Sequence, residues 1–385
     1  MKKIAYIELD THAEIALNFM ELMNDSKVFS VDYYFSEKIL RFFGFAQNDK
    51  LPENIKKATP ENLIQQLSTD NYQLIIIGTV HRYFNVFEKI AEKFNTSIIC
   101  HNLNFVKASN FDLLSSIFKE DFQYRLKLLL KEGLLKKSKV YQKSKNLLVL
   151  DQGFDSAQPD KYKFLPIFFN KFSEKPKNET YTIVVPGEVS QKRRDYKSVI
   201  KKLKNLELNI EESELRRSET FVENTLSEKG SSVGTTQNLE IIFLGKASGK
   251  ELEMLQDFDS SGSLRMPNVS IKYFTEKVPQ DVFDEYMQKA NILWCPIQQE
   301  TEFFSKKEIY GAPKMSGNIG DAIKFGKLAI FPENYPSKYA FIIPEIHNIE
   351  AQLYTQQKHL EYDFQENFSK EKVLKQLEKT IFALL

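Results

Sequence analysis

Short apolar runs alternate with amphipathic segments from one end of the chain to the other. Several runs are almost continuously apolar, such as LIIIG, TIVVP and EIIFLG, which is typical of parallel strands covered by helices on both faces. Helical periodicity marks the intervening stretches, including Glu14–Met23, Val86–Phe94, Asp195–Leu206 and Gln280–Ala290. Strands are predicted at Lys3–Leu9, Val28–Phe35, Gln73–Gly78, Thr96–Cys100, Asn146–Asp151, Tyr181–Pro186, Leu239–Gly245, Val269–Phe274, Asn291–Cys295 and Leu328–Phe331. This alternation predicts an α/β protein with two doubly wound sheets.

A polar segment at Asn170–Thr180, which contains proline and has no apolar periodicity, divides the chain. We therefore expect an N-terminal domain over 1–170 and a C-terminal domain over 181–365, a division that suits a length of 385 residues. Residues 366–385 are expected to form a C-terminal helix that can pack back on the N-terminal domain. The charged, Ser/Thr-rich stretch at 209–237 is interpreted as a flexible surface insertion, with a functional loop as the alternative.

Composition and charge exclude several classes of protein. A content of 42% apolar and 27% charged residues indicates a globular chain. The net charge of +1 gives no general attraction to nucleic acid. Two cysteines are too few for a disulfide framework or a zinc site. The first residues, MKKIAYIELD, lack the apolar core of a signal peptide, and no run approaches the roughly 18 apolar residues of a spanning helix. We therefore expect a cytoplasmic protein.

The stretch from Phe111 to Lys145 differs from the other helical segments in its charge. Phe122, Leu126, Leu130 and Leu134 recur at helical spacing, and eight basic residues against one acid lie between Arg125 and Lys145. A basic amphipathic helix of this kind can lie on an anionic membrane surface. The alternative is a helix that packs on the core and exposes its lysines to solvent.

Three of the five histidines follow predicted strands of the first domain: His12, His81 and His101. Ligands bind beyond the carboxyl ends of the strands in open parallel sheets. A single histidine in such a place is more often structural, but three together favour a polar site.

The loop after TIVVP carries one glycine and a cluster of basic residues, namely Gly187, Lys192, Arg193 and Arg194. Glycine lets the backbone approach a ligand, and a helix N-terminus beside a basic cluster favours anions. The loop therefore suits a diphosphate, with a solvated basic turn as the alternative.

A second glycine-rich stretch spans Glu308 to Lys327 and reads EIYGAPKMSGNIGDAIKFGK. Its turn at Ser316–Gly320 can direct backbone N–H groups at phosphate oxygens, and a helix is expected to open at Asp321. It contains neither a P-loop nor the spacing of a dinucleotide-binding motif. The residues expected to contact a phosphate-bearing ligand are Lys314, Ser316, Gly317, Asn318 and Asp321.

This second stretch resembles the donor-binding motif of retaining GT-B glycosyltransferases, which pairs Glu-x-Phe-Gly with Glu-Ala-Met-Ala-x-Gly. Residues 308–311 match the first part, and residues 321–326 match the second with Asp321 in place of glutamate. Twelve residues separate Glu308 from Asp321, whereas the family has seven. The loop at Gly187 similarly resembles the family's strand-end turn with its basic phosphate ligands. The resemblance covers about Thr182 to Pro332 and implies two Rossmann-like domains that face each other across a cleft.

The resemblance also implies roles for these residues. Arg193, Arg194 and Lys314 would stabilise the departing diphosphate without a metal or other cofactor, since a diphosphate leaving group needs fixed cations. Asp321 would accept hydrogen bonds from the ribose hydroxyls, and Glu308 would accept hydrogen bonds from the donor sugar. His81 or His101 would contact the sugar or the acceptor hydroxyl. In an inverting enzyme the general base would be His12.

The predicted function is therefore transfer of a sugar from a nucleoside-diphosphate sugar to a glycan or lipid-linked acceptor in cell-surface polysaccharide or glycoconjugate synthesis, with retention. The alternatives are a nucleotide-sugar epimerase of the same fold and a non-catalytic nucleotide-sugar-binding protein. Nucleic acid is not an expected partner.

Overall fold

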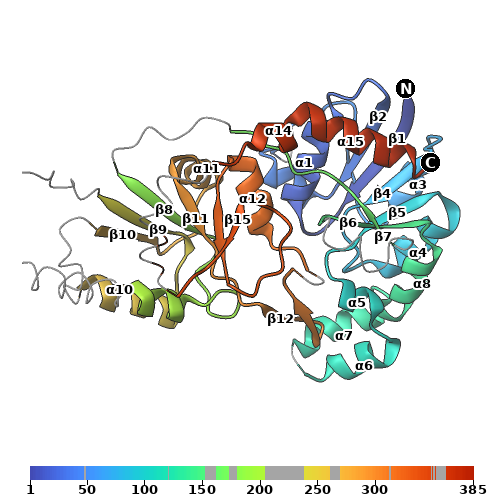
Figure 1. The fold of residues 1–385 in the computed structure, drawn as a ribbon. Helices are drawn as coiled ribbons and strands as arrows, with labels where there is room; N and C mark the ends of the chain where they lie inside the picture. Colours follow the sequence, from blue (N-terminus) through green and yellow to red (C-terminus); the bar gives the residue numbers. More distant parts are fainter. Residues whose placement is uncertain are drawn as a thin grey trace, which may run out of the picture. The chain divides into compact units, whose positions relative to one another are not determined.

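A computed structural model describes residues 1–46, 49–119, 121–151, 162–172, 180–203, 238–260, 269–311, 314–347, 349, 352 and 361–385. The predicted insertion at 209–237 lies outside these residues. The chain forms two compact units (Figure 1). Unit 1 comprises Met1–Lys171, Glu300–Ser316 and Gln365–Leu385, and unit 2 comprises Phe172–Gln299 and Gly317–Phe364.

Unit 1 is built on a parallel seven-stranded sheet with the order β3-β2-β1-β4-β5-β6-β7. The central strands are buried along most of their length, which explains their continuous apolar sequence. Because β1, β4 and β5 are adjacent, the turns that follow them lie together at one end of the sheet. The strands are β1 Lys2–Glu8, β2 Phe29–Phe35, β3 Ile55–Lys57, β4 Leu74–Ile77, β5 Thr96–Ile99, β6 Asn146–Val149 and β7 Tyr162–Phe164.

Helices cover both faces of this sheet. One face packs against α1 (Ala13–Met23), α2 (Glu37–Phe42) and α15 (Lys370–Phe382). Figure 1 shows α15, in red, alongside α1, with α14 (Phe364–Phe368) just before it. The opposite face packs against α3 (Leu63–Leu67), α4 (Phe84–Lys93), α5 (Leu103–Lys107) and α8 (Lys137–Lys143).

The prediction of a continuous basic helix within 111–145 is wrong. The segment forms α6 (Asn110–Ile117), α7 (Phe122–Leu130), a 3₁₀ turn at Leu134–Lys136, and α8. The break between α7 and the 3₁₀ turn falls at Gly133, whose φ of 76° cannot continue a right-handed helix. The predicted apolar stripe is split as a result, since Phe122 and Leu130 are exposed whereas Leu134 is buried.

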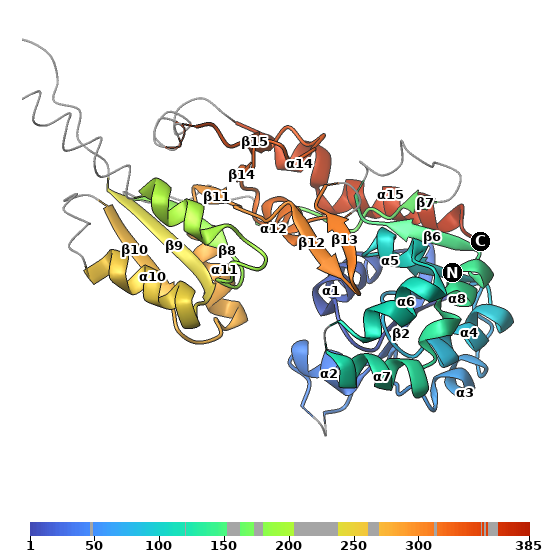
Figure 2. The ribbon, with the colours of Figure 1, turned by 90° about the horizontal axis from the view of Figure 1, so that it is seen from below.

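A two-stranded hairpin belongs to unit 1 although it lies between two unit 2 elements in the sequence. It consists of β12 (Glu300–Phe303) and β13 (Lys306–Ile309). Figure 2 shows the hairpin beside α5 and α6. Phe304, at its turn, is buried in the same core as α4 and α5. The hairpin is further held by an ion pair of 2.6 Å between Lys306 and Asp112.

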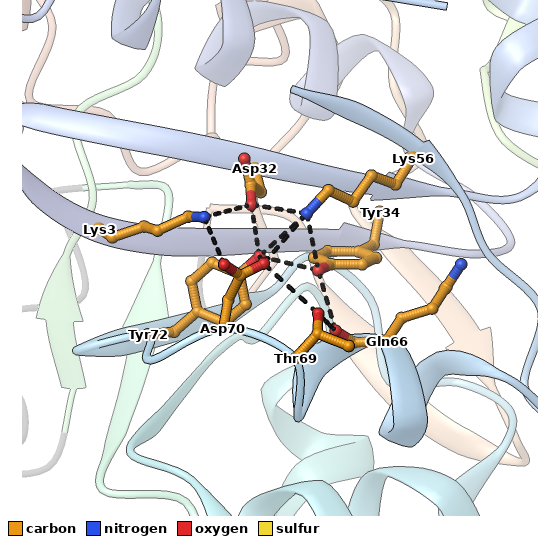
Figure 3. A network of polar contacts seen from close by, with 8 residues as sticks. All are labelled: Lys3, Asp32, Tyr34, Lys56, Gln66, Thr69, Asp70 and Tyr72. Carbon is orange, nitrogen blue, oxygen red and sulfur yellow. Dashed lines mark hydrogen bonds and ion pairs between the residues drawn. The ribbon is translucent and has the colours of Figure 1, made fainter. Parts of the chain in front are cut away.

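A network of charged and phenolic side chains connects the first three strands of unit 1 (Figure 3). Lys56 on β3 donates to the carboxylate of Asp32 on β2 at 2.8 Å. Lys3 on β1 donates to Asp70 at 2.7 Å. The hydroxyl of Tyr72 donates to Asp32 at 2.5 Å and lies 3.1 Å from the carboxylate of Asp70. Two lysines thus balance two aspartates, and both buried or half-buried carboxylates are hydrogen-bonded.

Unit 2 contains a parallel six-stranded sheet with the order β10-β9-β8-β11-β14-β15. The predicted α/β class with two doubly wound sheets is confirmed. Among the described residues, no helix combines the length and apolar character needed to cross a membrane. The unit 2 elements are β8 Tyr181–Pro186, a helix over 196–203, β9 Leu239–Lys246, α10 Gly249–Ser260, β10 Val269–Phe274, α11 Gln280–Lys289, β11 Ile292–Trp294, α12 Gly317–Phe325, β14 Ala329–Phe331 and β15 Ile342–Pro344.

Candidate functional site

The three histidines predicted at strand ends of unit 1 come together. His12 follows β1, His81 follows β4, and His101 follows β5. The rings of His12 and His101 are stacked, with centroids 3.7 Å apart and an interplanar angle of 14°. The ring of His81 lies edge-on at 6.1 Å from each of the others. The adjacency of β1, β4 and β5 produces this cluster.

Two of these histidines are held in the neutral state. Burial, with smaller contributions from the charges of His12 and Lys314, lowers the pKa of His81 to about 3. Burial, with the neighbouring charges of His12 and His81, also lowers the pKa of His101 far below its usual value. Neutral imidazoles offer both a donor and an acceptor, which suits hydroxyl groups.

The hairpin brings Glu308 and Lys314 to unit 1, beside the histidine cluster. The side chain of Glu308 is fully buried, and its Oε1 accepts from the backbone N–H of Phe105 at 3.1 Å. Burial raises the pKa of this carboxyl, although the Phe105 N–H and the charge of Lys314 oppose the shift. Among the described residues Glu308 Oε2 is buried without a hydrogen-bond partner. An unsatisfied buried oxygen of this kind is a candidate ligand contact.

Two further residues of this cluster were not predicted as site residues. Asn102 lies 3.4 Å from His81 through its Nδ2, and its Oδ1 is also buried without a partner in the described structure. Phe303 of the hairpin packs against His81, with ring centroids 4.7 Å apart. Asn102 follows His101 directly after a strand, so its position in the sequence could have indicated it. Phe303 could not be found in this way, because its contact depends on the unpredicted hairpin.

Unit 2 holds a second group of predicted residues. Gly187 follows β8 with a φ of 100°, and a Cβ at this position would collide with the guanidinium of Arg194. Arg194 Nη2 donates to Oδ1 of Asn318 at 3.4 Å, and Nδ2 of Asn318 donates to Asp321 at 3.2 Å. Arg194 Nε is buried without a hydrogen-bond partner among the described residues. A partly buried guanidinium with an unused donor is suited to an anionic ligand.

The basic cluster does not act as one group. Lys192 and Arg193 are exposed, whereas Arg194 is partly buried and directed at Gly187. The backbone of Arg193 fixes this turn, because its N–H donates to Ser190 and its carbonyl accepts from Gln298. Arg194 is therefore the basic residue of the loop whose position the fold defines.

The predicted phosphate-binding turn at Ser316–Gly320 is corrected by the structure. Helix α12 begins at Gly317, so Gly317, Asn318 and Gly320 lie in its first turn. Gly320 and Asn318 are buried there, and their packing extends the helix towards its N-terminus beyond the expected start at Asp321. Backbone N–H groups for an anion would therefore come from a helix N-terminus.

Glu308 and Asp321, which the family motif pairs, belong to different units. Glu308, Lys314 and Ser316 lie in unit 1, and Gly317, Asn318 and Asp321 lie in unit 2. Among the described residues no three His, Cys, Asp or Glu side chains are grouped so that they could hold a metal ion. The expectation of a metal-independent reaction stays a prediction.

Comparison with solved structures identifies the class of fold. The chain is similar to the apo form of the lipopolysaccharide outer core galactosyltransferase WaaB, with 12% identity over all of both chains and a TM-score of 0.53. It is similar to a UDP-forming α,α-trehalose-phosphate synthase from Burkholderia xenovorans, with 8% identity over 100% of this chain and 98% of the other, and a TM-score of 0.56. A UDP-GlcNAc 2-epimerase from Methanocaldococcus jannaschii matches with 10% identity over 99% of each chain and a TM-score of 0.51.

These likenesses define a protein of two Rossmann-like α/β units. The fold is similar to that of GT-B glycosyltransferases, so the resemblance seen in the sequence is confirmed at the level of the fold. Comparisons with family models and with curated protein sequences find no match.

Proposed function

We propose that the protein is a glycosyltransferase that uses a nucleoside-diphosphate sugar as donor. The observation that carries this proposal is the arrangement of Gly187, Arg194 and the N-terminus of α12 in a GT-B fold. A positive-φ glycine allows close backbone approach, and a guanidinium with an unused donor offers a charge-assisted hydrogen bond to phosphate. Similar folds in a galactosyltransferase and a UDP-forming synthase support the proposal.

Each unit has a separate task in this proposal. In unit 2, Arg194 and the first N–H groups of α12 hold the diphosphate, while Lys192 and Arg193 add positive charge at the surface. Asp321 accepts from the ribose hydroxyls. In unit 1, Glu308, Asn102 and the neutral histidines have unused or mixed hydrogen-bonding capacity and contact hydroxyl groups of the sugars.

The reaction breaks the bond between the sugar's anomeric carbon and the diphosphate oxygen, and the diphosphate leaves with the electron pair. The fixed cation at Arg194 offsets the negative charge that develops there. The acceptor oxygen bonds to the anomeric carbon and loses its proton. With retention, which we propose, the departing phosphate oxygen takes that proton. With inversion, His12 would be the base.

Nucleotide-dependent thermal stabilisation, followed by a transfer assay, tests the proposal. A nucleoside diphosphate at a hundred times its dissociation constant should stabilise the protein by about 2.7 kcal/mol. Transfer from the stabilising nucleotide's sugar conjugates to glycan or lipid-linked acceptors is then measured by nucleoside-diphosphate release. Absence of stabilisation by any of the common nucleoside diphosphates would contradict the proposed donor.

An epimerase is the second candidate, because a UDP-GlcNAc 2-epimerase has a similar fold. An epimerase would convert a nucleotide sugar without any acceptor, and proton NMR of the sugar would detect the new epimer. A non-catalytic binding protein would be stabilised by the nucleotide but would neither transfer nor convert the sugar.

We further propose that the acceptor is lipid-linked and that unit 1 contacts an anionic membrane surface. Helices α6 and α7 expose a set of large apolar side chains, which we call the apolar patch: Phe111, Leu114, Phe118, Phe122 and Leu130. Lys119, Lys127 and Lys131 are exposed on or next to the same helices. Apolar side chains flanked by lysines suit the boundary between headgroups and acyl chains of an anionic bilayer.

Several of the eight basic residues between Arg125 and Lys145 are not available to a membrane surface. Arg125 is buried and donates to the carbonyl of Ser116. Lys137 is buried and donates to three carbonyls at the end of α5, at 2.6, 2.9 and 2.6 Å. Lys136 and Lys143 pair with Glu88. The proposal of membrane contact therefore relies mainly on the apolar patch.

A further inference from the structure

A buried carboxylate, Glu8, connects the turn that carries His12 to the turn that carries His81. Glu8 is the last residue of β1 and is 1% exposed. Its Oε1 accepts from the backbone N–H groups of Asp10 at 3.2 Å and Thr11 at 3.3 Å. Its Oε2 accepts from the hydroxyl of Thr79 at 2.7 Å. One carboxylate thus holds both loops through three hydrogen bonds.

Glu8 also affects the position of the third histidine, His101, because both contact Gly78. A Cβ on Gly78 would lie 2.5 Å from Glu8 Oε2 and 2.7 Å from the hydroxyl of Tyr6, so residue 78 must be glycine for Glu8 to occupy this place. The carbonyl of Gly78 lies 2.8 Å from Nε2 of His101 and is hydrogen-bonded to it. All three histidines are therefore positioned by backbone that touches Glu8 or its immediate neighbours.

The backbone at His12 needs such support. His12 has a φ of 59° and a ψ of 39°, a left-handed conformation that residues with a Cβ adopt rarely. Its side chain forms no capping hydrogen bond to α1. The two residues just before it, Asp10 and Thr11, donate hydrogen bonds from their backbone N–H groups to Glu8. Strained residues of this kind persist where the surrounding structure holds them, and they concentrate at functional sites.

We propose that Glu8 is a positioning residue for the proposed glycosyl transfer, and that its ionised carboxylate fixes the cluster of His12, His81 and His101. The inference rests on the proposed function for its role in turnover. It does not depend on that function for its effect on the histidines.

The charge state of Glu8 decides how many donors it can accept. Burial raises the pKa of Glu8 to about 7, although the Thr79 hydroxyl, the charge of His12 and the two backbone N–H groups oppose the shift. The ionised form accepts all three hydrogen bonds, whereas the protonated form must use one oxygen as a donor. The three hydrogen bonds that hold the two turns should therefore weaken as pH falls through about 7.

Several other titratable or charged groups surround Glu8. Tyr6 lies on the same strand, and burial raises its pKa well above the usual range. Glu14 faces His12 at 3.4 Å, and Asp10 faces Arg82 at 3.4 Å and Lys38 at 3.5 Å. His81 and His101 stay neutral near pH 7. A test must therefore distinguish the effect of Glu8 from the effect of its neighbour His12.

Histidine NMR on the full chain gives a test that does not require activity. The ring signals of His81 and His101 should shift with a midpoint near pH 7, although neither ring titrates there. The inflection should persist in His12→Gln and disappear in Glu8→Gln, with Glu92→Gln as the matched exposed control. An inflection that remains in Glu8→Gln, or that disappears in His12→Gln alone, would overturn the proposal.

Two further measurements keep the inference testable. If Glu8→Gln does not fold, Thr79→Val should raise the midpoint because it removes a hydrogen bond that lowers the pKa of Glu8, whereas Thr79→Ser should leave it unchanged. An unchanged midpoint in Thr79→Val counts against the proposal.

In a transfer assay Glu8→Gln should lower kcat by about ten- to a hundredfold, leave the donor KM within about twofold, and remove the loss of activity on the acid side of about pH 7. A folded Glu8→Gln with wild-type kcat and pH profile would also reject it. Absence of transfer by the wild type would instead reject the proposed function, and the NMR result would still decide the role of Glu8.

Discussion

The guanidinium of Arg194 occupies the space that a side chain at Gly187 would need. Gly187 also has a φ of 100°, so the position demands glycine for two independent reasons. Gly187→Ala should therefore displace Arg194 and abolish most nucleotide binding, besides destabilising the fold by about 1–2 kcal/mol. Gly249→Ala is the control, because Gly249 has a φ of 58° with open space around it and reports backbone strain alone. Equal nucleotide affinity in the two variants by calorimetry would show that the clash does not matter.

Arg194→Ala tests the proposed diphosphate contact directly. Loss of a charged hydrogen bond should weaken nucleoside-diphosphate binding by about 1.5–3 kcal/mol, which is roughly a ten- to 150-fold increase in Kd. Lys197→Ala provides a control of similar charge change, since Lys197 is exposed on the helix over 196–203. If both variants bind like the wild type, Arg194 is not a phosphate ligand.

The two motif acids should affect different steps. Asp321→Asn should lower nucleotide affinity, because the ribose loses a charged acceptor. Glu308→Gln should lower turnover and leave nucleotide affinity unchanged, because Glu308 belongs to the other unit and contacts Phe105. Isothermal calorimetry and steady-state kinetics on both variants separate the effects. The reverse pattern would mean that the family roles do not apply to these positions.

The network at Asp32 and Asp70 should make unit 1 sensitive to acid. Burial alone would raise the pKa of Asp32, but hydrogen bonds from Lys56 and Tyr72 outweigh it and lower the pKa overall. The hydrogen bond from Lys3 lowers the pKa of Asp70 to about 2. Because both carboxyls have depressed pKa values in the folded state, their stabilisation is present above about pH 4 and is lost as pH falls towards 2.

Asp32→Asn tests this acid sensitivity. The variant should unfold more easily at pH 7 by about 1–3 kcal/mol, since Lys56 and Tyr72 lose a charged acceptor. The difference from the wild type should shrink below about pH 4, and denaturant unfolding at several pH values measures it. A difference that does not change with pH would assign the effect to packing.

Vesicle cosedimentation tests the apolar patch. The wild type should bind anionic vesicles more strongly than neutral ones, with binding reduced by salt. Phe111→Ser with Phe118→Ser should abolish binding, because these rings are 79% and 81% exposed at α6 and its end. Phe382→Ser on α15 is the control, since it removes an exposed ring elsewhere in unit 1. Equal, negligible binding of the wild type to both vesicles at low salt would favour a soluble acceptor.

The strands could be predicted because burial on both faces gives each of them a continuous apolar run. Every predicted strand corresponds to an observed one, with shifts of one or two residues at the ends. The short edge strands β3, β7 and β15 were missed, since three residues carry too little periodicity. The hairpin β12–β13 was also missed. Its turn places Phe304 and Ser305 at φ values of 50° and 55°, without the Asn-Gly signal that usually marks such a turn.

The candidate site was predictable where it depends on strand ends and unpredictable where it depends on tertiary contacts. His12, His81 and His101 could be grouped, because each directly follows a strand. Lys314 could not be placed, since its membership of unit 1 follows from the packing of the hairpin on α5. The stretch before Asp321 contains two glycines and resembled a loop, yet burial of Asn318 and Gly320 makes it helical.

The separated segments of unit 1 have a consequence for the order in which the protein can fold during synthesis. Phe304 of the hairpin and Leu377 and Ile381 of α15 are buried in the cores of unit 1, but the ribosome makes them after β11 and β15 of unit 2, respectively. Domains usually fold as they emerge, with the N-terminal one first. In this chain one apolar face of the unit 1 sheet stays incompletely covered until α15 has been translated. Nascent chains stalled before Lys370 should therefore be more readily cleaved by protease in unit 1 than completed chains are.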